Sequence, residues 1–314
     1  MARHAPVAAV PLLDIGRWLE ARKVAVAIAW GLLDVEAALR GWDGPLLFAC
    51  HNSERSFTRR TAKAARHRAF RVVAVSKAAL RTMRRVPEEK RRVVHNGLDP
   101  ARVAPARPRE VVREELGVRP GVFLWGACLR MSPEKRPDAM IRAAADLGPG
   151  FRLVLCGDGP RRARYERLNA SLGSPAIMLP HSFEVGSLLG ALDCFCGLWD
   201  GEGFWYAGME AALAGVPLAC VTAGLLEEIR ADRAGTPWDW GPFDNAEYHC
   251  GPLWQVILPN GSSEEETVAD AVWAVRQDRE TALAKAAALR SVAAEYTVER
   301  MVAGWEDLIW ESLP

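Results

Sequence analysis

The chain of 314 residues is predicted to be an α/β protein built from two units, each a parallel β-sheet flanked by helices. Three observations predict this class. The length corresponds to two domains of roughly 150 residues each. Apolar residues make up 50% and charged residues 25% of the chain, which is the balance of an ordinary globular protein. Short apolar, β-branched runs also alternate with helical stretches, which is typical of parallel sheets.

The first alternating series occupies the first hundred residues or so. Its apolar runs predict strands, and the stretches between them predict helices. The strands are expected over residues 24–29, 45–50, 71–75 and 92–95, and the helices over residues 33–40, 56–67 and 77–85.

A second series begins near Gly121 and follows the same rhythm. Its strands are expected over residues 122–126, 152–156, 176–179, 193–197 and 216–222, and its helices over residues 137–146, 161–172, 185–192 and 207–214.

Three stretches depart from this rhythm. Residues 99–119, rich in Pro, Arg and Ala, are predicted to be a linker between the two units. Residues 231–254 contain three prolines and three tryptophans and are predicted to be an ordered excursion. From residue 263 onward, apolar residues recur at spacings of three and four, which predicts two or three amphipathic helices.

Composition excludes several classes of protein. The net charge of +1 does not favour nucleic acid as a partner, and the apolar run over residues 24–33 is too short to span a bilayer. The first residues, interrupted by Pro and Asp, do not resemble a signal peptide. Seven cysteines, mostly in strand-like segments, favour buried free thiols in a reducing compartment. We expect a cytoplasmic protein without zinc or disulfides, because no second pair joins Cys194 and Cys196.

Charge is nevertheless concentrated in one segment. Residues 51–92 contain fourteen Lys and Arg against three Glu, a net charge of +11. One explanation is two helices with solvated basic faces. An equally good one is a surface that meets anionic lipid headgroups or a phosphorylated acceptor. Nucleic acid is a weaker interpretation, since only Phe57 and Phe70 could stack on bases there.

Two parallel sheets place their ligands at the carboxyl ends of their strands, so the loops that follow the strands are the candidate site. In "LRMSPEKRPDAMIRAA", Arg130 and Lys135 follow a strand and precede a helix. Two cations in that position are suited to a diphosphate, although a solvated loop is equally consistent with the pattern.

Two more loops carry suggestive residues. Gly157 and Gly159 turn the chain from a strand into a helix and permit close backbone approach to a nucleotide, which is weak evidence alone. In "DGEGFWYAGMEAALAGVP", Glu202 lies in a Gly-flanked loop and Glu210 in the first turns of the next helix. Amides around 204–206 would face an anion at that helix start, and Glu210 could accept hydrogen bonds from a ribose diol.

In these motifs the second half resembles the donor-binding domain of the family-4 retaining glycosyltransferases, which have the GT-B fold. "LRMSPEKR" is similar to their diphosphate motif, with Arg130 and Lys135 at the paired positions and Leu129 and Arg136 in place of its glycines. "EGFWYAGMEAALAGVP" is similar to their E-x7-E motif. "VTAGLLEEI" resembles the next family segment and places Thr222 and Glu228.

The first half resembles the same family. "VVHNGLDP" is similar to the segment at the family's domain boundary and "RVVAVSKA" to the strand before it. "FACHNSE" resembles the strand that ends in a histidine near the donor sugar, which maps to His51, although a capping or core histidine would be favoured without the other motifs. No Gly-Gly loop follows an opening strand, so we expect the first Rossmann-like domain to be incomplete.

The resemblance implies a GT-B-like α/β fold with three parts. Residues 1–105 would be a shortened acceptor-side domain, residues 106–296 a nucleotide-sugar-binding domain, and residues 297–314 a helix that could return to the first domain.

It also implies a hexosyltransferase of glycan biosynthesis that moves a sugar, with retention, from a nucleotide-sugar donor to a glycan or lipid-linked acceptor. Cations neutralise the leaving diphosphate, so neither a metal nor another cofactor is expected. The implied catalytic residues are His51, Glu202, Arg130 and Lys135, and the implied donor-binding residues are Gly157, Gly159, Gly203, Phe204, Trp205, Tyr206, Glu210 and Thr222.

Two departures from the family keep alternatives open. Trp205 replaces a small residue near the donor and would narrow the pocket unless its side chain points away. The short first domain leaves room for a non-catalytic protein that binds a nucleotide-sugar or a partner chain, and for a homo- or hetero-oligomer that covers the incomplete sheet. A nicotinamide-dependent oxidoreductase is a distant third, because G-x-G-x-x-G is absent after the first strand.

Overall fold

The structure is a computed structural model. It describes residues 14–30, 39–51, 70–81, 83–198, 201–221, 224–232, 254–255 and 264–313. The helix predicted over residues 56–67 lies outside these residues, as do residues 33–38 of the helix predicted over 33–40 and most of the excursion over 231–254.

The chain divides into two compact units. The first consists of Met1–His95, Gly201–Phe204 and Glu299–Pro314, and the second of Asn96–Asp200 and Trp205–Val298. The functional domain boundaries expected after residues 105 and 296 stay predictions.

The first unit contains a sheet of four parallel strands in the order β1-β2-β3-β4. The four strands expected from the apolar runs are therefore confirmed, with ends that shift by up to three residues. All five residues of β2 are buried, which explains why this strand reads as a continuous apolar run. The strands are β1 (Ala27–Trp30), β2 (Leu46–Cys50), β3 (Arg71–Ala74) and β4 (Arg91–Val93).

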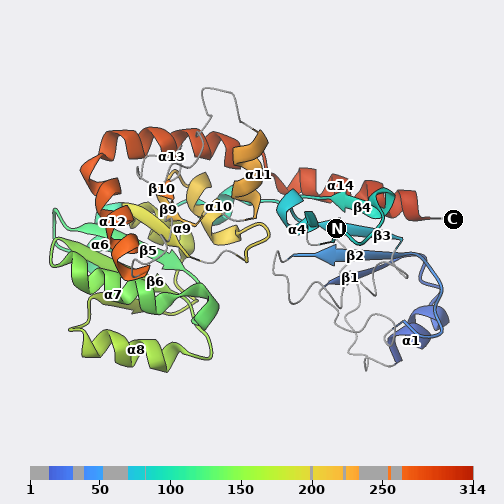
Figure 1. The fold of residues 1–314 in the computed structure, drawn as a ribbon, viewed down its shortest axis with the longest axis horizontal. Helices are drawn as coiled ribbons and strands as arrows, with labels where there is room; N and C mark the ends of the chain where they lie inside the picture. The colour runs from blue at the N-terminus through green and yellow to red at the C-terminus, as the bar shows by residue number, and fades with distance from the viewer. Residues whose placement is uncertain are drawn as a thin grey trace. The chain divides into compact units, whose positions relative to one another are not determined.

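Helix α14 (Val298–Ser312) packs on this sheet and completes its core (Figure 1). Leu308 joins Leu47 and Val73 of the neighbouring strands in one apolar cluster, with Trp305 and Ile309 beside it. These helix positions share one face, as the spacing of three and four predicts. The unit also contains the short helices α1 (Ile15–Ala21), α4 (Lys77–Arg81) and η2 (Glu88–Lys90).

The second unit contains six parallel strands in the order β10-β9-β8-β5-β6-β7. Since β5 lies between β8 and β6, the strand order reverses there, and such a switch point opens a crevice at the carboxyl ends of the strands. The short strand β10 falls at the end of the stretch expected to be an excursion. The strands are β5 (Phe123–Cys128), β6 (Phe151–Cys156), β7 (Ala176–Leu179), β8 (Cys194–Gly197), β9 (Leu218–Cys220) and β10 (Trp254–Gln255).

Helices surround this second sheet (Figure 1). The core includes Trp125, Leu153 and Leu155 of the central strands, all fully buried. The tail forms α12 (Glu264–Gln277), α13 (Arg279–Ala293) and α14, which confirms the prediction of two or three amphipathic helices. The remaining helices are η3 (Pro133–Lys135), α7 (Pro137–Leu147), α8 (Arg162–Ser171), α9 (Val185–Ala191), α10 (Tyr206–Leu213) and α11 (Leu225–Asp232).

The prediction of a linker over residues 99–119 is wrong, because this segment folds into α5 (Pro100–Val103) and α6 (Arg109–Glu115). Asp99 caps α5 by accepting a hydrogen bond from the amide of Ala101 at 2.9 Å, and Pro100 occupies the first helical position. Asp followed by Pro is a helix-start signal, which the overall composition of the segment concealed.

The structure describes six of the cysteines as free thiols. Five of these six are buried, as the strand-like segments predict. Within the described ranges, no group of three or more His, Cys, Asp or Glu is placed to hold a metal ion. None of the helices in the described part of the chain is long and apolar enough to cross a membrane.

Candidate functional site

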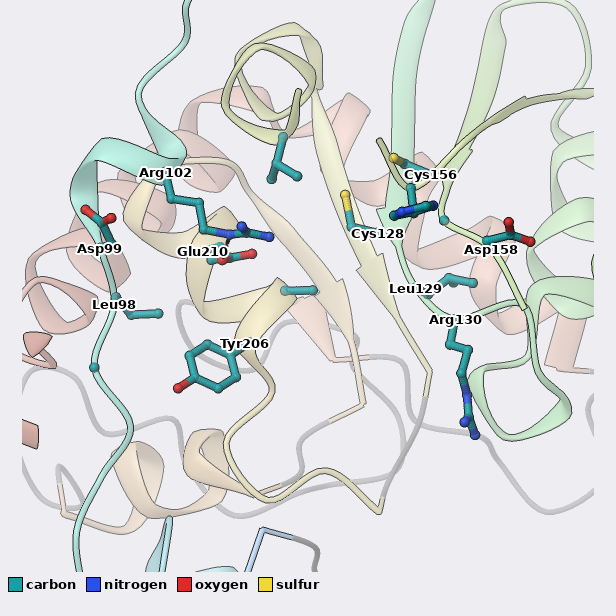
Figure 2. A pocket seen from close by; sticks show the side chains of 15 residues that line it. Leu98, Asp99, Arg102, Cys128, Leu129, Arg130, Cys156, Asp158, Tyr206 and Glu210 are labelled. Carbon is teal, nitrogen blue, oxygen red and sulfur yellow. Dashed lines mark hydrogen bonds and ion pairs between the residues drawn. The ribbon is translucent and has the colours of Figure 1, made fainter. Parts of the chain in front are cut away.

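A cavity of about 660 Å³ opens at the carboxyl ends of β5 and β6 in the second unit (Figure 2). Its walls come from α5, from the loops after β5, β6 and β7, and from the first turns of α10. In Figure 2, Arg102 and Glu210 lie on one side and Arg130 and Asp158 on the other. The lining residues are Gly97, Leu98, Asp99, Arg102, Cys128, Leu129, Arg130, Cys156, Gly157, Asp158, His181, Val185, Tyr206, Ala207 and Glu210.

A second cavity, of about 820 Å³, lies at the opposite ends of the strands and is the weaker candidate. Arg109 and Arg113, which line it, already bind the Asp193 carboxylate and backbone carbonyls. These contacts hold α6 to the sheet, which favours a structural role for the two arginines.

Glycines allow the loops after β5 and β6 to meet on the wall of the first cavity. Gly157 has φ 146°, and a Cβ there would lie 1.9 Å from the Leu129 carbonyl oxygen. A Cβ on Gly159 would lie 2.7 Å from the Met131 nitrogen. The Met131 amide donates to the Asp158 carbonyl at 2.8 Å and joins the two loops. Gly157 lines the cavity and Gly159 does not. Both glycines are needed for the contact between the loops, because a Cβ at either position would meet backbone atoms of the neighbouring loop.

Arg130 lines the cavity with a side chain that is 65% exposed. It donates to Glu134 at 2.5 Å and to the Ser132 hydroxyl at 3.3 Å. Burial alone would raise the pKa of Glu134, but hydrogen bonds from Ser132 and Arg130 lower it to about 2. Glu134 is therefore charged at neutral pH and partly neutralises Arg130. Lys135, at the end of η3, is not among the lining residues of the cavity.

Glu210 lies in α10 with its side chain only 12% exposed. Its Oε1 accepts a 2.6 Å hydrogen bond from Nε of Arg102, a residue 108 positions away in the chain. Sequence reasoning missed Arg102 because it assigned this segment to a linker. The helix-start signal of Asp99 and Pro100 could have placed an ordered arginine beside the predicted site.

Trp205 does not narrow this cavity. It adopts a left-handed backbone with φ 60° and ψ 65° immediately before α10. Its indole packs against Gly197 and Gly208, where an added Cβ would lie 2.0 Å and 2.1 Å from ring atoms. The indole is not among the lining groups, whereas Tyr206 is.

His51 follows β2 in the first unit and is held by packing. Its ring stacks on Trp30 with centroids 4.9 Å apart, and burial lowers its pKa, so it is neutral at pH 7. The buried Nε2 has no hydrogen-bond partner among the described residues. A Cβ on Gly203, within the same unit, would lie 2.0 Å from the His51 carbonyl oxygen, which places the residue after Glu202 against His51.

The structure thus gathers part of the predicted set. Arg130, Gly157, Tyr206 and Glu210 line one cavity of the second unit, and His51 and Gly203 touch within the first. Phe204 is 2% exposed and Glu228, in α11, is 4% exposed. Thr222 lies outside the described residues.

Comparison with solved structures shows the fold. HepE of Anabaena in complex with UDP and glucose superposes with a TM-score of 0.70 at 19% identity, over 85% of this chain and 72% of that one. Sucrose-phosphate synthase of Thermosynechococcus elongatus superposes with a TM-score of 0.69 at 16% identity, over 98% of this chain and 81% of that one. The fold is that of the GT-B glycosyltransferases, as predicted.

Family models make the assignment more specific. "Glycosyltransferase Family 4" matches residues 3–102 and "Glycosyl transferases group 1" matches residues 109–236. Together the two models show a family-4-like glycosyltransferase, as the resemblance predicted, while the E-x7-E motif itself stays a prediction.

Two curated relatives agree with this assignment. The GDP-mannose-dependent alpha-(1-6)-phosphatidylinositol dimannoside mannosyltransferase of Mycobacterium tuberculosis is 33% identical over 141 residues, or 43% of this chain. The D-inositol 3-phosphate glycosyltransferase of Salinispora arenicola is 30% identical over 166 residues, or 46% of this chain. The match spans 37% of each relative's own length, little more than a third.

Proposed function

We propose that this protein transfers a hexose from a nucleotide-sugar donor to an acceptor hydroxyl, with retention of the anomeric configuration and without a metal ion. One observation carries the proposal. A single cavity at the topological switch point of the second unit brings together Arg130, the start of α10 and Glu210. Arg130 and the amides at the start of α10 suit a negatively charged diphosphate, and Glu210 suits a ribose diol.

The reaction first requires groups that stabilise the leaving diphosphate. A departing nucleoside diphosphate gains negative charge, and donors already in place stabilise it without reorganisation. Arg130 faces the cavity, and Lys135 lies five residues further along the same loop. The first amides of α10, an eight-residue helix, offer further hydrogen bonds to an anion.

The sugar is oriented by groups from the other loops. We assign Glu202 to its hydroxyls and neutral His51 to a hydrogen bond, because an imidazole without charge can both donate and accept. The incoming hydroxyl attacks on the face from which the diphosphate departs, as retention in the family implies. The acceptor we propose is a glycan or a lipid-linked acceptor.

Donor identity is tested by binding. One curated relative is named for GDP-mannose and one solved structure holds UDP and glucose, so both nucleotides belong in the experiment. Titration calorimetry with GDP, UDP, GDP-mannose and UDP-glucose should show binding of one family of nucleotides. Release of the nucleoside diphosphate in the presence of chelator and of candidate acceptors then tests transfer and metal independence.

Glu210→Ala should weaken nucleotide binding about tenfold or more, because a hydrogen bond to a charged group contributes about 1.5–3 kcal/mol. Thermal unfolding must show that the variant remains folded. Unchanged affinity would remove Glu210 from the site. Nucleotide binding without any transfer or hydrolysis would favour the alternative, a non-catalytic binding protein.

Two further proposals concern partners of the first unit. Its basic segment is proposed to lie at an anionic membrane, and exposed Arg81, Arg84 and Arg85 belong to the described part of that segment.

Ile28 and Trp30 on β1 are 36% and 53% exposed, which supports self-association through this sheet. Light scattering that finds only a monomer at micromolar concentration would contradict the self-association.

A further inference from the structure

Arg102 and Glu210 form an ion pair inside the candidate donor cavity. Nε of Arg102 lies 2.6 Å from Oε1 of Glu210, and both side chains line the cavity (Figure 2). The Arg102 side chain is 60% exposed and that of Glu210 is 12% exposed. The arginine therefore reaches from an open position to a carboxylate that is largely enclosed.

The backbone of Arg102 is held in place by its neighbours. Asp99 caps α5, and a Cβ on Gly186 of α9 would lie 2.3 Å from the carbonyl oxygen of Ala104 at the end of α5. The amide of Arg107 donates to the Ser187 hydroxyl at 3.0 Å. These contacts fix α5 against α9 and so hold the backbone from which the Arg102 side chain extends to Glu210 in α10.

The pair leaves hydrogen-bonding capacity facing the cavity. A guanidinium has five N–H donors, and Arg102 uses Nε for Glu210. Within the described residues, the two Nη groups and Oε2 of Glu210 make no other hydrogen bond. One carboxylate oxygen is therefore held by the arginine while the other is open to a ligand.

We propose that Arg102 is a positioning residue that aims Glu210 at the ribose and so makes the site select ribonucleotides over 2′-deoxyribonucleotides. This inference rests on the proposed function. With Oε1 fixed, Oε2 presents its lone pairs to the 2′- and 3′-hydroxyls. A carboxylate held in one orientation gains more from a diol than a mobile one, because less side-chain freedom is lost on binding.

The test compares each nucleoside diphosphate with its 2′-deoxy form by calorimetry, using UDP, GDP and their deoxy analogues. The wild-type protein should prefer the ribonucleotide about tenfold or more, since a hydrogen bond to a charged group contributes about 1.5–3 kcal/mol. In Arg102→Met the preference should fall to about threefold or less, because the ribonucleotide loses affinity while the deoxynucleotide keeps nearly all of its own. Arg102→Lys should restore part of the preference.

A double-mutant cycle adds a readout that a general structural defect would not move. Glu210→Gln should lower the ribose preference by itself, and adding Arg102→Met should then change it little, since both residues act through one contact. Arg167→Met, on the exposed face of α8, is the matched control for loss of one positive charge and should keep the wild-type preference.

The outcomes separate the two proposals. Tight nucleotide binding with an unchanged ribose preference in folded Arg102→Met and Arg102→Lys overturns the role of Arg102 and leaves the proposed function standing. A wild-type protein that binds no nucleoside diphosphate overturns both.

Discussion

Trp205 provides the left-handed backbone turn before α10, while its side chain stays outside the cavity. Left-handed backbone in a residue other than glycine costs of order 1–3 kcal/mol and persists only where its surroundings determine it. Here the indole fills the space left by Gly197 and Gly208. The bulky residue is therefore compatible with an open donor cavity.

Arg130 and Lys135 are predicted to contribute unequally to phosphate binding. Arg130→Met should weaken a nucleoside diphosphate about tenfold, and Lys135→Met less, because only Arg130 lines the cavity. Both variants should lose more affinity for the diphosphate than for the monophosphate in calorimetry. Equal losses for the two ligands would contradict the assigned role in diphosphate binding.

His51 is predicted to make stability depend on pH. Its pKa lies below the ordinary value of 6.5 because burial disfavours the charged ring. Below pH 6.5, His51 binds a proton in the unfolded chain but remains neutral in the folded chain until the pH reaches its lower folded pKa. Stability should therefore fall as pH falls and then level off below the folded pKa.

Urea denaturation midpoints at several values between pH 5 and pH 8 test this dependence, with about 6.5 as the upper edge of the effect. His51→Gln should flatten the profile in that window. His181→Gln is the control, because His181 is exposed, and should keep the wild-type profile. Identical profiles for all three proteins would show that His51 titrates normally.

At the scale of elements, α6 is bound to the amino ends of strands in the second sheet through Asp193. Its residues Arg109 and Arg113 lie 2.6 Å and 3.1 Å from the Asp193 carboxylate, and Arg279 of α13 lies 3.4 Å from it. The amide of Leu124 in β5 donates to the same carboxylate at 2.8 Å. One side chain thus joins two helices to a central strand.

Asp193→Asn should lower the free energy of unfolding by about 3 kcal/mol, since it leaves three partly buried arginines without their common counter-charge. Urea denaturation followed by circular dichroism measures the loss. Asp146→Asn, at an exposed position of α7, removes the same charge and should change stability by less than about 0.5 kcal/mol. Similar small effects for both variants would mean that α6 is held by apolar contacts instead.

At the scale of the whole molecule, charge is unevenly distributed along the chain. Residues 51–92 carry a net charge of +11 in a protein of net charge +1, so the remainder carries −10. We propose that this segment draws the protein to anionic surfaces although the overall charge is nearly balanced.

The chain should therefore co-sediment with vesicles containing phosphatidylglycerol at low salt and be released at high salt, because exposed charges are screened within about 10 Å at 0.1 M. The triple variant Arg81→Glu, Arg84→Glu and Arg85→Glu should weaken binding to these vesicles, and neutral phosphatidylcholine vesicles serve as control. Sedimentation that responds to neither lipid charge nor salt would leave the basic residues as a solvated surface.

Local patterns by themselves determined the fold class of this protein. Strands β2, β3, β5, β6 and β7 could be read as short apolar runs, because strands of a parallel sheet are buried on both faces. The helices of the tail could be read from the 3.6-residue spacing of their apolar residues. The loop that carries Arg130 and the helix start that carries Glu210 could be placed for a related reason. Parallel strands bring their carboxyl ends to one edge of a sheet, so the loops that follow them converge.

Only the tertiary structure decided which side chains meet. Arg102 and Glu210 are 108 residues apart, and their ion pair depends on how α5 packs beside α10. Whether Lys135 reaches the cavity, and which way Trp205 points, depends on loop packing around Met131, Gly197 and Gly208. Such contacts join distant segments and carry no local period, so no window of sequence contains them.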